Sequence, residues 1–180
     1  MGAVSTPLPV KLMFAVTYDP SVDLNSVLSI LNARFGTPEY TYGPLPFTWT
    51  RYYAEEMGEN LMKFYFNYPD FIDRSLIVSL KHYTNELEKS FMVDGKRRVN
   101  IDPGYIARDK LVLATTKDFY HRLYLGDGIY GEVTLHYRRG KYRIFSWTYP
   151  DFREPELHSF LEKARARLVK EIRVQEETRE

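Results

Sequence analysis

The second half of the chain, residues 97–151, consists of short segments with strand-like alternation that are separated by turn signals. The clearest pair is residues 130–138 and 141–147, which Arg139-Gly140 would join into a β-hairpin. Residues 97–101 and 110–116 are two further predicted strands, and Pro103-Gly104 is expected to end the first of them in a turn. Several strands in succession favour a sheet that is mostly antiparallel.

The first half of the chain mixes strand and helix patterns. Residues 11–18 are apolar on both faces, as in a central strand that is covered on both sides. A helix is predicted next, capped by Ser21 or Asp23 and ended by Gly36. The remaining segments are an irregular or edge strand at 37–50, a strand at 60–68, a helix at roughly 71–90 and an amphipathic helix from 154 to about 174.

This order of elements predicts an α+β fold. We expect a mixed, mostly antiparallel sheet with two helices packed on it, the helices lying on one face, together with a C-terminal amphipathic helix. A length of 180 residues suits a single domain, placed at 10–174. Residues 1–9 are then a flexible lead-in and residues 175–180 a solvated tail.

Composition excludes several classes of protein. The chain has no cysteine, so disulfides, thiolate metal sites and cysteine nucleophiles are excluded. None of the four histidines pairs with another at helical spacing, so a zinc site has no support. The longest apolar run is too short for a membrane span, and the start is unlike a signal peptide, so a cytoplasmic location without a membrane partner is expected. A net charge of +1 argues against recruitment of nucleic acid.

Polar residues of chemically useful types lie in the predicted hairpin strand. Strict alternation from residue 131 to 137 would place Glu132, Thr134 and His136 on one face, opposite Val133 and Leu135. If that face is covered, these side chains line one cleft and acid–base work becomes available to them. If the face is open, they are only solvated.

Asp102 stands at the predicted end of a strand, next to Asn100. The following proline holds the aspartate in an extended conformation, which suits a catalytic or metal-binding carboxylate. Initiation of a turn by the aspartate is the competing interpretation.

Cations and hydroxyls gather between residues 115 and 122. Thr115, Lys117, His121 and Arg122 form a set that suits a phosphate or carboxylate ligand, with a fork from the arginine and a point charge from the lysine. A salt-bridged surface loop is the alternative. A second basic cluster, at 138–143, could follow a nucleic-acid backbone or be a solvated hairpin tip.

The chain resembles the bacterial family described as domain of unknown function 4416. The resemblance covers roughly residues 10–170 and rests on YYAEEMG at 52–58, KHYTNELE at 81–88, VNIDPGY at 99–105, LATTKDFYHRLYL at 113–125, GIYGEVTL at 128–135 and WTYPDFR at 147–153. It implies no particular activity. The family motifs include Glu56, Asn85, Asp102, Lys117, His121, Arg122, Glu132 and Asp151, which supports one shared site.

The sequence therefore predicts a polar pocket for a small anionic ligand, phosphorylated or nucleotide-like, and leaves open whether the protein is an enzyme. The catalytic candidates are Asp102, His121 and Glu132. The ligand-binding candidates are Lys117, Arg122, Thr115, Asn100, Thr134, Glu56 and Asp151. The carboxylates with a histidine could hold Mg²⁺ or Mn²⁺.

Two alternatives stay open beside that pocket. One is a non-catalytic module that binds RNA or a protein through the basic, aromatic hairpin at 138–143. The other is a buried network in which the polar residues satisfy one another. The sequence does not indicate the oligomeric state or the order of the strands.

Overall fold

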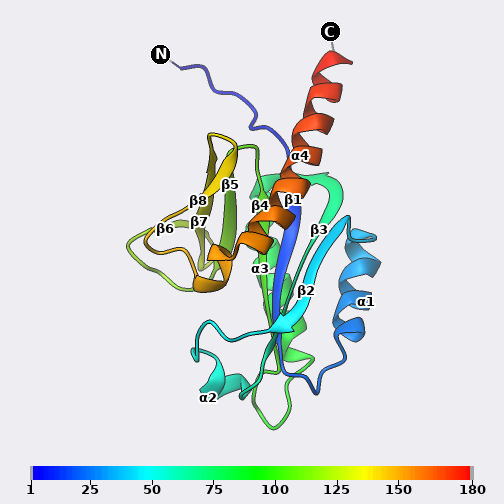
Figure 1. Ribbon diagram of the computed structural model, residues 1–180, viewed down its shortest axis with the longest axis vertical. Helices are drawn as coiled ribbons and strands as arrows, with labels where there is room; N and C mark the ends of the chain where they lie inside the picture. Colours follow the sequence, from blue (N-terminus) through cyan, green and yellow to red (C-terminus); the bar gives the residue numbers. More distant parts are fainter. Residues whose placement is uncertain (1, 179–180) are drawn as a thin grey trace.

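A computed structural model describes residues 2–178 and shows an eight-stranded sheet with helices on both faces (Figure 1). The elements, in chain order, are β1 (Val10–Tyr18), α1 (Leu24–Phe35), β2 (Tyr40–Pro46), α2 (Ala54–Met57), β3 (Met62–Ile72), η1 (Arg74–Leu76), α3 (Ile77–Lys89), β4 (Val99–Ile106), β5 (Lys110–Thr115), β6 (Arg122–Gly126), β7 (Ile129–Arg138), β8 (Lys141–Ile144), η2 (Pro150–Arg153) and α4 (Pro155–Glu177).

The strands follow the order β2-β3-β1-β4-β5-β7-β6, and β8 also pairs with β7. Each of these pairings is antiparallel. The predicted α+β class is therefore confirmed. The segment at 37–50 does contain an edge strand, β2, although that strand ends at Pro46.

Helices cover both faces of the sheet, so the expectation that they lie on one face is wrong. Phe14 and Val16 of β1 pack in a core with Val27 of α1 and Leu80 of α3. Met13 and its same-face neighbours pack in a second core that includes the apolar stripe of α4. In Figure 1, α4 crosses one side of the sheet and α3 lies behind it. Because β1 is apolar on both faces, both faces need a cover.

The helix boundaries follow from local capping. The Asp23 side chain accepts a hydrogen bond from the Asn25 amide at 3.0 Å, and Gly36 ends α1 with φ +87°. Asp73 accepts from the Ser75 amide at 2.8 Å and opens η1. The helix expected at 71–90 is shorter because β3 extends to Ile72. Helix α4 runs to Glu177, into the expected tail, whose residues 179–180 lie outside the described residues, as does residue 1 of the lead-in.

Pro103-Gly104 lies inside β4 and does not end it, contrary to the predicted turn. Pairing of β4 with β5 begins only at Gly104, so the strand is paired on one side alone at the proline, where the missing amide is tolerated. Glycine is required next to it for space. A Cβ at residue 104 would lie 2.6 Å from the carbonyl oxygen of Val112.

Strand β7 contains a bulge, so its side chains do not alternate regularly between the two faces of the sheet as predicted. Leu135 and Val133 pair with consecutive residues of β5, so Thr134 is an extra residue in the strand. Leu135 therefore packs on the α4 side of the sheet while Val133 packs on the other. The expectation that Glu132 and His136 share one face is wrong for this reason. Strand β6 was also not predicted, and β8 is shorter than the expected 141–147.

Candidate functional site

A cavity of about 600 Å³ lies where β4 and β5 separate. The two strands pair through three residue pairs only, and beyond Gly104 the gap between them is bordered by α3 and by the loops before α2 and α4. Twenty-two residues line it. They are Phe47, Thr50, Tyr52, Tyr53, Lys63, Lys81, Asn85, Glu88, Arg97, Asn100, Asp102, Leu113, Ala114, Thr115, Thr116, Lys117, Arg122, Glu132, Tyr149, Pro150, Asp151 and Phe152.

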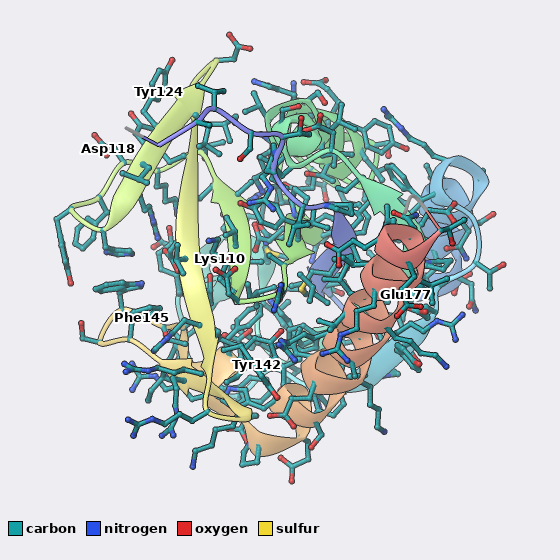
Figure 2. All side chains as sticks on the ribbon, turned by 90° about the horizontal axis from the view of Figure 1, so that it is seen from above. Lys110, Asp118, Tyr124, Tyr142, Phe145 and Glu177 are labelled. Atoms are coloured by element: carbon teal, nitrogen blue, oxygen red, sulfur yellow. The ribbon has the colours of Figure 1, made fainter. Side chains whose placement is uncertain are left out.

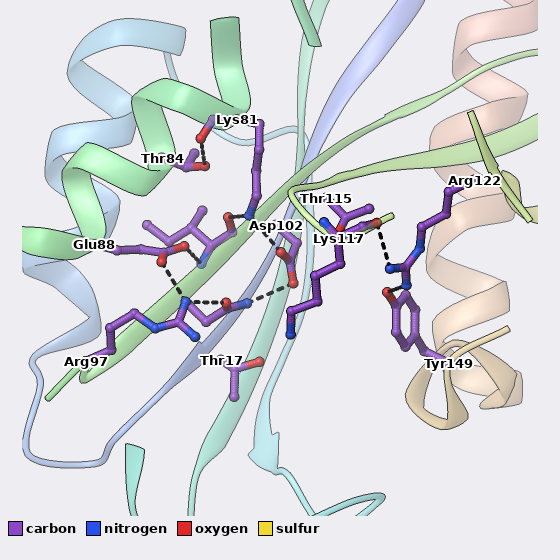
Figure 3. A network of polar contacts seen from close by, with 12 residues as sticks. Thr17, Lys81, Thr84, Glu88, Arg97, Asp102, Thr115, Lys117, Arg122 and Tyr149 are labelled. Carbon is purple, nitrogen blue, oxygen red and sulfur yellow. Dashed lines mark hydrogen bonds and ion pairs between the residues drawn. The ribbon is translucent and has the colours of Figure 1, made fainter. Parts of the chain in front are cut away.

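Side chains of α3 replace the missing strand along the open edge of β4 (Figure 3). The Ile101 amide donates to Oε1 of Glu88 at 2.6 Å. Nζ of Lys81 donates to the Ile101 carbonyl at 3.1 Å and to Oδ1 of Asp102 at 3.0 Å. Both backbone groups of Ile101 are thereby satisfied although no strand pairs with this residue on that side of β4, and the gap stays open.

The pKa values of the two carboxyl groups on this wall, Asp102 and Glu88, are shifted in opposite directions. Burial opposes ionisation of Asp102, but the ammonium groups of Lys81 and Lys63 outweigh it, so the pKa of Asp102 lies below its ordinary value. For Glu88 burial prevails over Lys81, and the pKa of Glu88 is raised. Asp102 is thus a stable anion facing the cavity, with 26% of its side chain exposed.

Arg97 connects Glu88 on this wall with Glu56, which is not a lining residue. Its guanidinium makes two hydrogen bonds to Glu56, at 2.6 and 2.7 Å, and one to Glu88 at 2.9 Å. The hydrogen bonds that Arg97 donates to Glu56 are the main reason that the pKa of Arg97 is raised. Glu56 itself lies outside the cavity lining and holds Arg97 in place.

The opposite wall is organised around Glu132 of β7. Its Oε2 lies 2.9 Å from Nε of Arg122 and 2.9 Å from Nε2 of His121. Arg122 also donates to the Lys117 carbonyl at 3.0 Å and to the Tyr149 hydroxyl at 2.8 Å. Glu132 is 1% exposed, and the same carboxylate oxygen contacts both the arginine and the histidine.

Lys117 is the lining cation that these pairings leave free. Within residues 2–178 no carboxylate lies at ion-pair distance from its Nζ, which stands 4.3 Å from the centre of the Tyr52 ring. Figure 3 shows its side chain extending into the space between Asp102 and Tyr149. Burial and, secondly, the positive charge of Arg122 lower the pKa of Lys117.

Lys63, which unlike Lys117 is buried, also lines the cavity. Lys63 donates to Oγ1 of Thr17 at 2.9 Å and lies 3.5 Å from Oδ2 of Asp151. The same carboxylate oxygen accepts a hydrogen bond from the Tyr65 hydroxyl at 2.7 Å. These contacts tie β1 and β3 to the loop before α4.

Aromatic side chains form much of the remaining surface. Phe47, Tyr52 and Tyr53 come from the segment between β2 and β3, and Tyr149 and Phe152 from the segment before α4. Burial, followed by the charge of Asp102, raises the pKa of Tyr53, which keeps its hydroxyl protonated. The cavity therefore combines flat apolar walls with a charged base.

Seven of the ten predicted site residues line this one cavity. They are Asn100, Asp102, Thr115, Lys117, Arg122, Glu132 and Asp151. The other three lie behind the wall: His121 and Thr134 both contact Glu132, and Glu56 contacts Arg97. His121 is stacked on Trp147, with ring centres 5.0 Å apart.

Several lining residues were not predicted. Lys81 and Glu88 were hidden beside the apolar stripe of α3, although they lie four and three residues from Asn85, which places all three on one helix face. Lys63 had a clearer signal, because it is a single charge between Met62 and Phe64 in a buried strand.

Metal ligation has no preformed site in the described structure. Between residues 2 and 178, no group of three or more histidine and carboxylate side chains is arranged to hold a metal ion. The Mg²⁺ or Mn²⁺ suggested by the sequence stays a prediction.

Comparison with known proteins identifies the family. The sequence model of the family described as domain of unknown function (DUF4416) matches residues 8–168. This chain belongs to the DUF4416 family. The DUF4416 match contains every strand from β1 onward and both walls of the cavity, since it ends within α4.

Two further comparisons gave no match, either among curated proteins or among solved structures. The cavity geometry is therefore the source of the functional argument for this DUF4416 member. None of the helices within residues 2–178 has the length and apolar character that a bilayer crossing requires.

Proposed function

We propose that the cavity between β4 and β5 binds a small anionic ligand that carries a flat ring, as phosphorylated, nucleotide-like molecules do. The observation that carries this proposal is the unpaired ammonium group of Lys117 in the cavity lining. The positive charge of Arg122 lowers the pKa of Lys117 further, so the two cations repel each other. An anionic group beside both of them would relieve that repulsion.

The charge balance of the lining supports a ligand with a compact anionic group. Four lining cations each have a carboxylate partner, and the fifth does not. The partnered sets are Lys81 with Asp102, Arg97 with Glu88, Lys63 with Asp151 and Arg122 with Glu132. One uncompensated positive charge favours a phosphate or carboxylate at that position and not an extended polyanion.

The rest of the ligand is assigned from the other lining groups. Rings of Tyr52, Tyr53 and Tyr149 offer apolar surface for a planar group, which gains affinity by stacking. Asp102, held as an anion, would accept a hydrogen bond from a ligand hydroxyl or amino group. A nucleotide contains all three of these features.

Isothermal titration calorimetry with separate parts of a nucleotide tests the proposal. The probes are nucleoside monophosphates, the matching nucleosides, ribose 5-phosphate and inorganic phosphate, each with and without Mg²⁺. We expect the monophosphates to bind more tightly than either part alone, because ring and anion are recognised by different walls. No binding by any phosphorylated probe would refute the proposal.

Substitution of Lys117 makes the test specific. Lys117→Met should weaken binding of the monophosphate about tenfold or more, since a charge-assisted hydrogen bond contributes about 1.5–3 kcal/mol. It should leave binding of the uncharged nucleoside unchanged. The matched control is Lys110→Met, because Lys110 lies at the start of β5 and outside the cavity lining. Equal effects of the two variants would contradict the assignment.

A further inference from the structure

A second surface, which contains none of the residues that line the cavity, carries cations without partners. Residues 133–150 contain no aspartate or glutamate, and the β7–β8 hairpin within them carries Arg138, Arg139, Lys141 and Arg143. In the part of the chain that the structure describes, none of these four side chains forms an ion pair. No direct partner therefore neutralises any of the four, although the whole chain has a net charge of only +1.

Strand register places three of these cations on one face. Arg138 pairs with Lys141, and His136 with Arg143, so their side chains project on the same side of the hairpin. Tyr142 projects on the other side and is 3% exposed in the core against α4. Figure 2 shows this division, with Tyr142 between the hairpin and α4 and Phe145 at the periphery of the molecule.

A column of stacked rings continues from this face. The ring of His136 lies 4.9 Å from that of Phe145, which lies 4.6 Å from Trp147, and Trp147 lies 5.0 Å from His121. The tryptophan is fixed by a hydrogen bond from its Nε1 to the carbonyl of Val133 at 3.0 Å. It fills the outer edge of β7 between β6 and β8, which both pair with that strand.

The far end of the column presents free rings to solvent. Tyr120 lies 4.9 Å from the His121 ring and is 76% exposed, and its neighbour Phe119 is 57% exposed. The two rings lie 5.0 Å apart and so form a contiguous exposed apolar patch, a feature that marks interaction sites when it is large. The cations at one end of this column and the open rings at the other define what we call the hairpin surface (residues 119–121, 136–147).

We propose that the hairpin surface binds single-stranded RNA. The unpaired cations would contact phosphates, and the free faces of Tyr120 and Phe119 would stack on bases. A duplex hides its base faces, whereas RNA is recognised mainly through unstacked bases that lie on aromatic rings or arginine planes. Charge complementarity and stacking together favour this partner over an acidic protein segment, which would use the cations and leave the rings bare.

Salt dependence supplies the first quantitative test. Binding of a fluorescent oligouridylate is measured by anisotropy over a series of salt concentrations. Four phosphate contacts predict that the logarithm of the association constant falls against that of salt with a slope of about −3. The double variant Arg138→Gln/Arg143→Gln should reduce this slope to about half. The control Lys163→Gln/Arg173→Gln, on exposed positions of α4, should leave it unchanged.

Removal of an exposed ring tests the stacking contribution. Tyr120→Ala should weaken oligouridylate binding about five- to hundredfold without changing the salt slope. Because Tyr120 is largely exposed, the variant should retain its thermal stability, and unfolding curves check this.

Competition identifies the partner. Unlabelled oligouridylate should displace the probe, and duplex RNA, oligothymidylate and polyglutamate should compete at least tenfold more weakly. Equal competition by polyglutamate would show a general polyanion surface, and equal competition by oligothymidylate would refute the choice of RNA. Absence of binding at low salt would refute the proposal. Lys117→Met should not affect RNA binding, so the proposal for the cavity and the proposal for the hairpin surface are tested separately.

Discussion

Glu88 combines a hydrogen-bond acceptor with a buried charge, and substitution can separate the two. Its Oε1 accepts from the Ile101 amide at 2.6 Å and its Oε2 from Arg97 at 2.9 Å. Burial nevertheless raises the pKa of Glu88, so its surroundings disfavour the charge on balance. We therefore predict that the acceptor contributes to stability and that the charge does not.

Two variants express this prediction. Glu88→Gln keeps an oxygen for the Ile101 amide, and its free energy of unfolding should stay within about 1 kcal/mol of wild type near neutral pH. Glu88→Met keeps the length and helix propensity of the side chain but leaves that amide without a partner. Because Ile101 is fully buried, the cost should be about 1–3 kcal/mol.

Urea-induced unfolding, followed by circular dichroism, measures both free energies. The control is Glu86→Met on the same helix, where the side chain is 70% exposed and pairs with Lys89 at the surface. Its loss should stay below about 0.5 kcal/mol. If Glu88→Gln lost as much stability as Glu88→Met, the charge would be the important feature and the reasoning would be wrong.

Three other perturbations have defined outcomes. Gly104→Ala forces a Cβ to 2.6 Å from the Val112 carbonyl, and urea unfolding should show a loss of about 1–3 kcal/mol. Asp102→Asn removes a carboxylate whose pKa the fold lowers, so the wild type should be more stable at neutral pH. That advantage should vanish as pH falls below the ordinary value of 3.8 and through the lowered pKa, as unfolding at a series of pH values would show. Binding of a nucleoside monophosphate should weaken as pH rises through the pKa of Lys117, and calorimetry giving a midpoint at or above 10.5 would contradict its lowered value.

Regular periodicity made the main elements predictable. β1 was recognised because it is apolar on both faces, and α1 because Asp23 and Gly36 bracket an apolar stripe. These signals depend on local sequence alone. The prediction failed where a neighbouring strand changes the meaning of a residue, as at Pro103, which looks like a turn until the one-sided pairing of β4 is known.

The bulge in β7 is another feature that local sequence does not reveal. Nothing in the residues around Thr134 distinguishes an extra residue from regular alternation, because the bulge is defined by pairing with β5. Its effect on the site was limited. Glu132 lies before the bulge and still faces the cavity, whereas His136 lies after it and belongs to the opposite face.

The candidate site residues were selected because polar side chains of chemically useful types are frequent in one part of the sequence. That selection does not show which of them lie close together in space. Lys81 and Glu88 escaped detection because their task is set by β4, whose open edge they satisfy. Such tertiary pairing has no counterpart in a single sequence. The aromatic walls were missed for a simpler reason, since tyrosine and phenylalanine are far more often core residues than ligand contacts.

The parting of β4 from β5 makes the cavity a property of the main chain. Exchange of a side chain around its rim alters the shape and charge offered to an occupant, but it does not close the space, because the two strands remain apart. A scaffold built in this way can change its specificity by single substitutions while keeping its architecture, and engineered variants could exploit that tolerance.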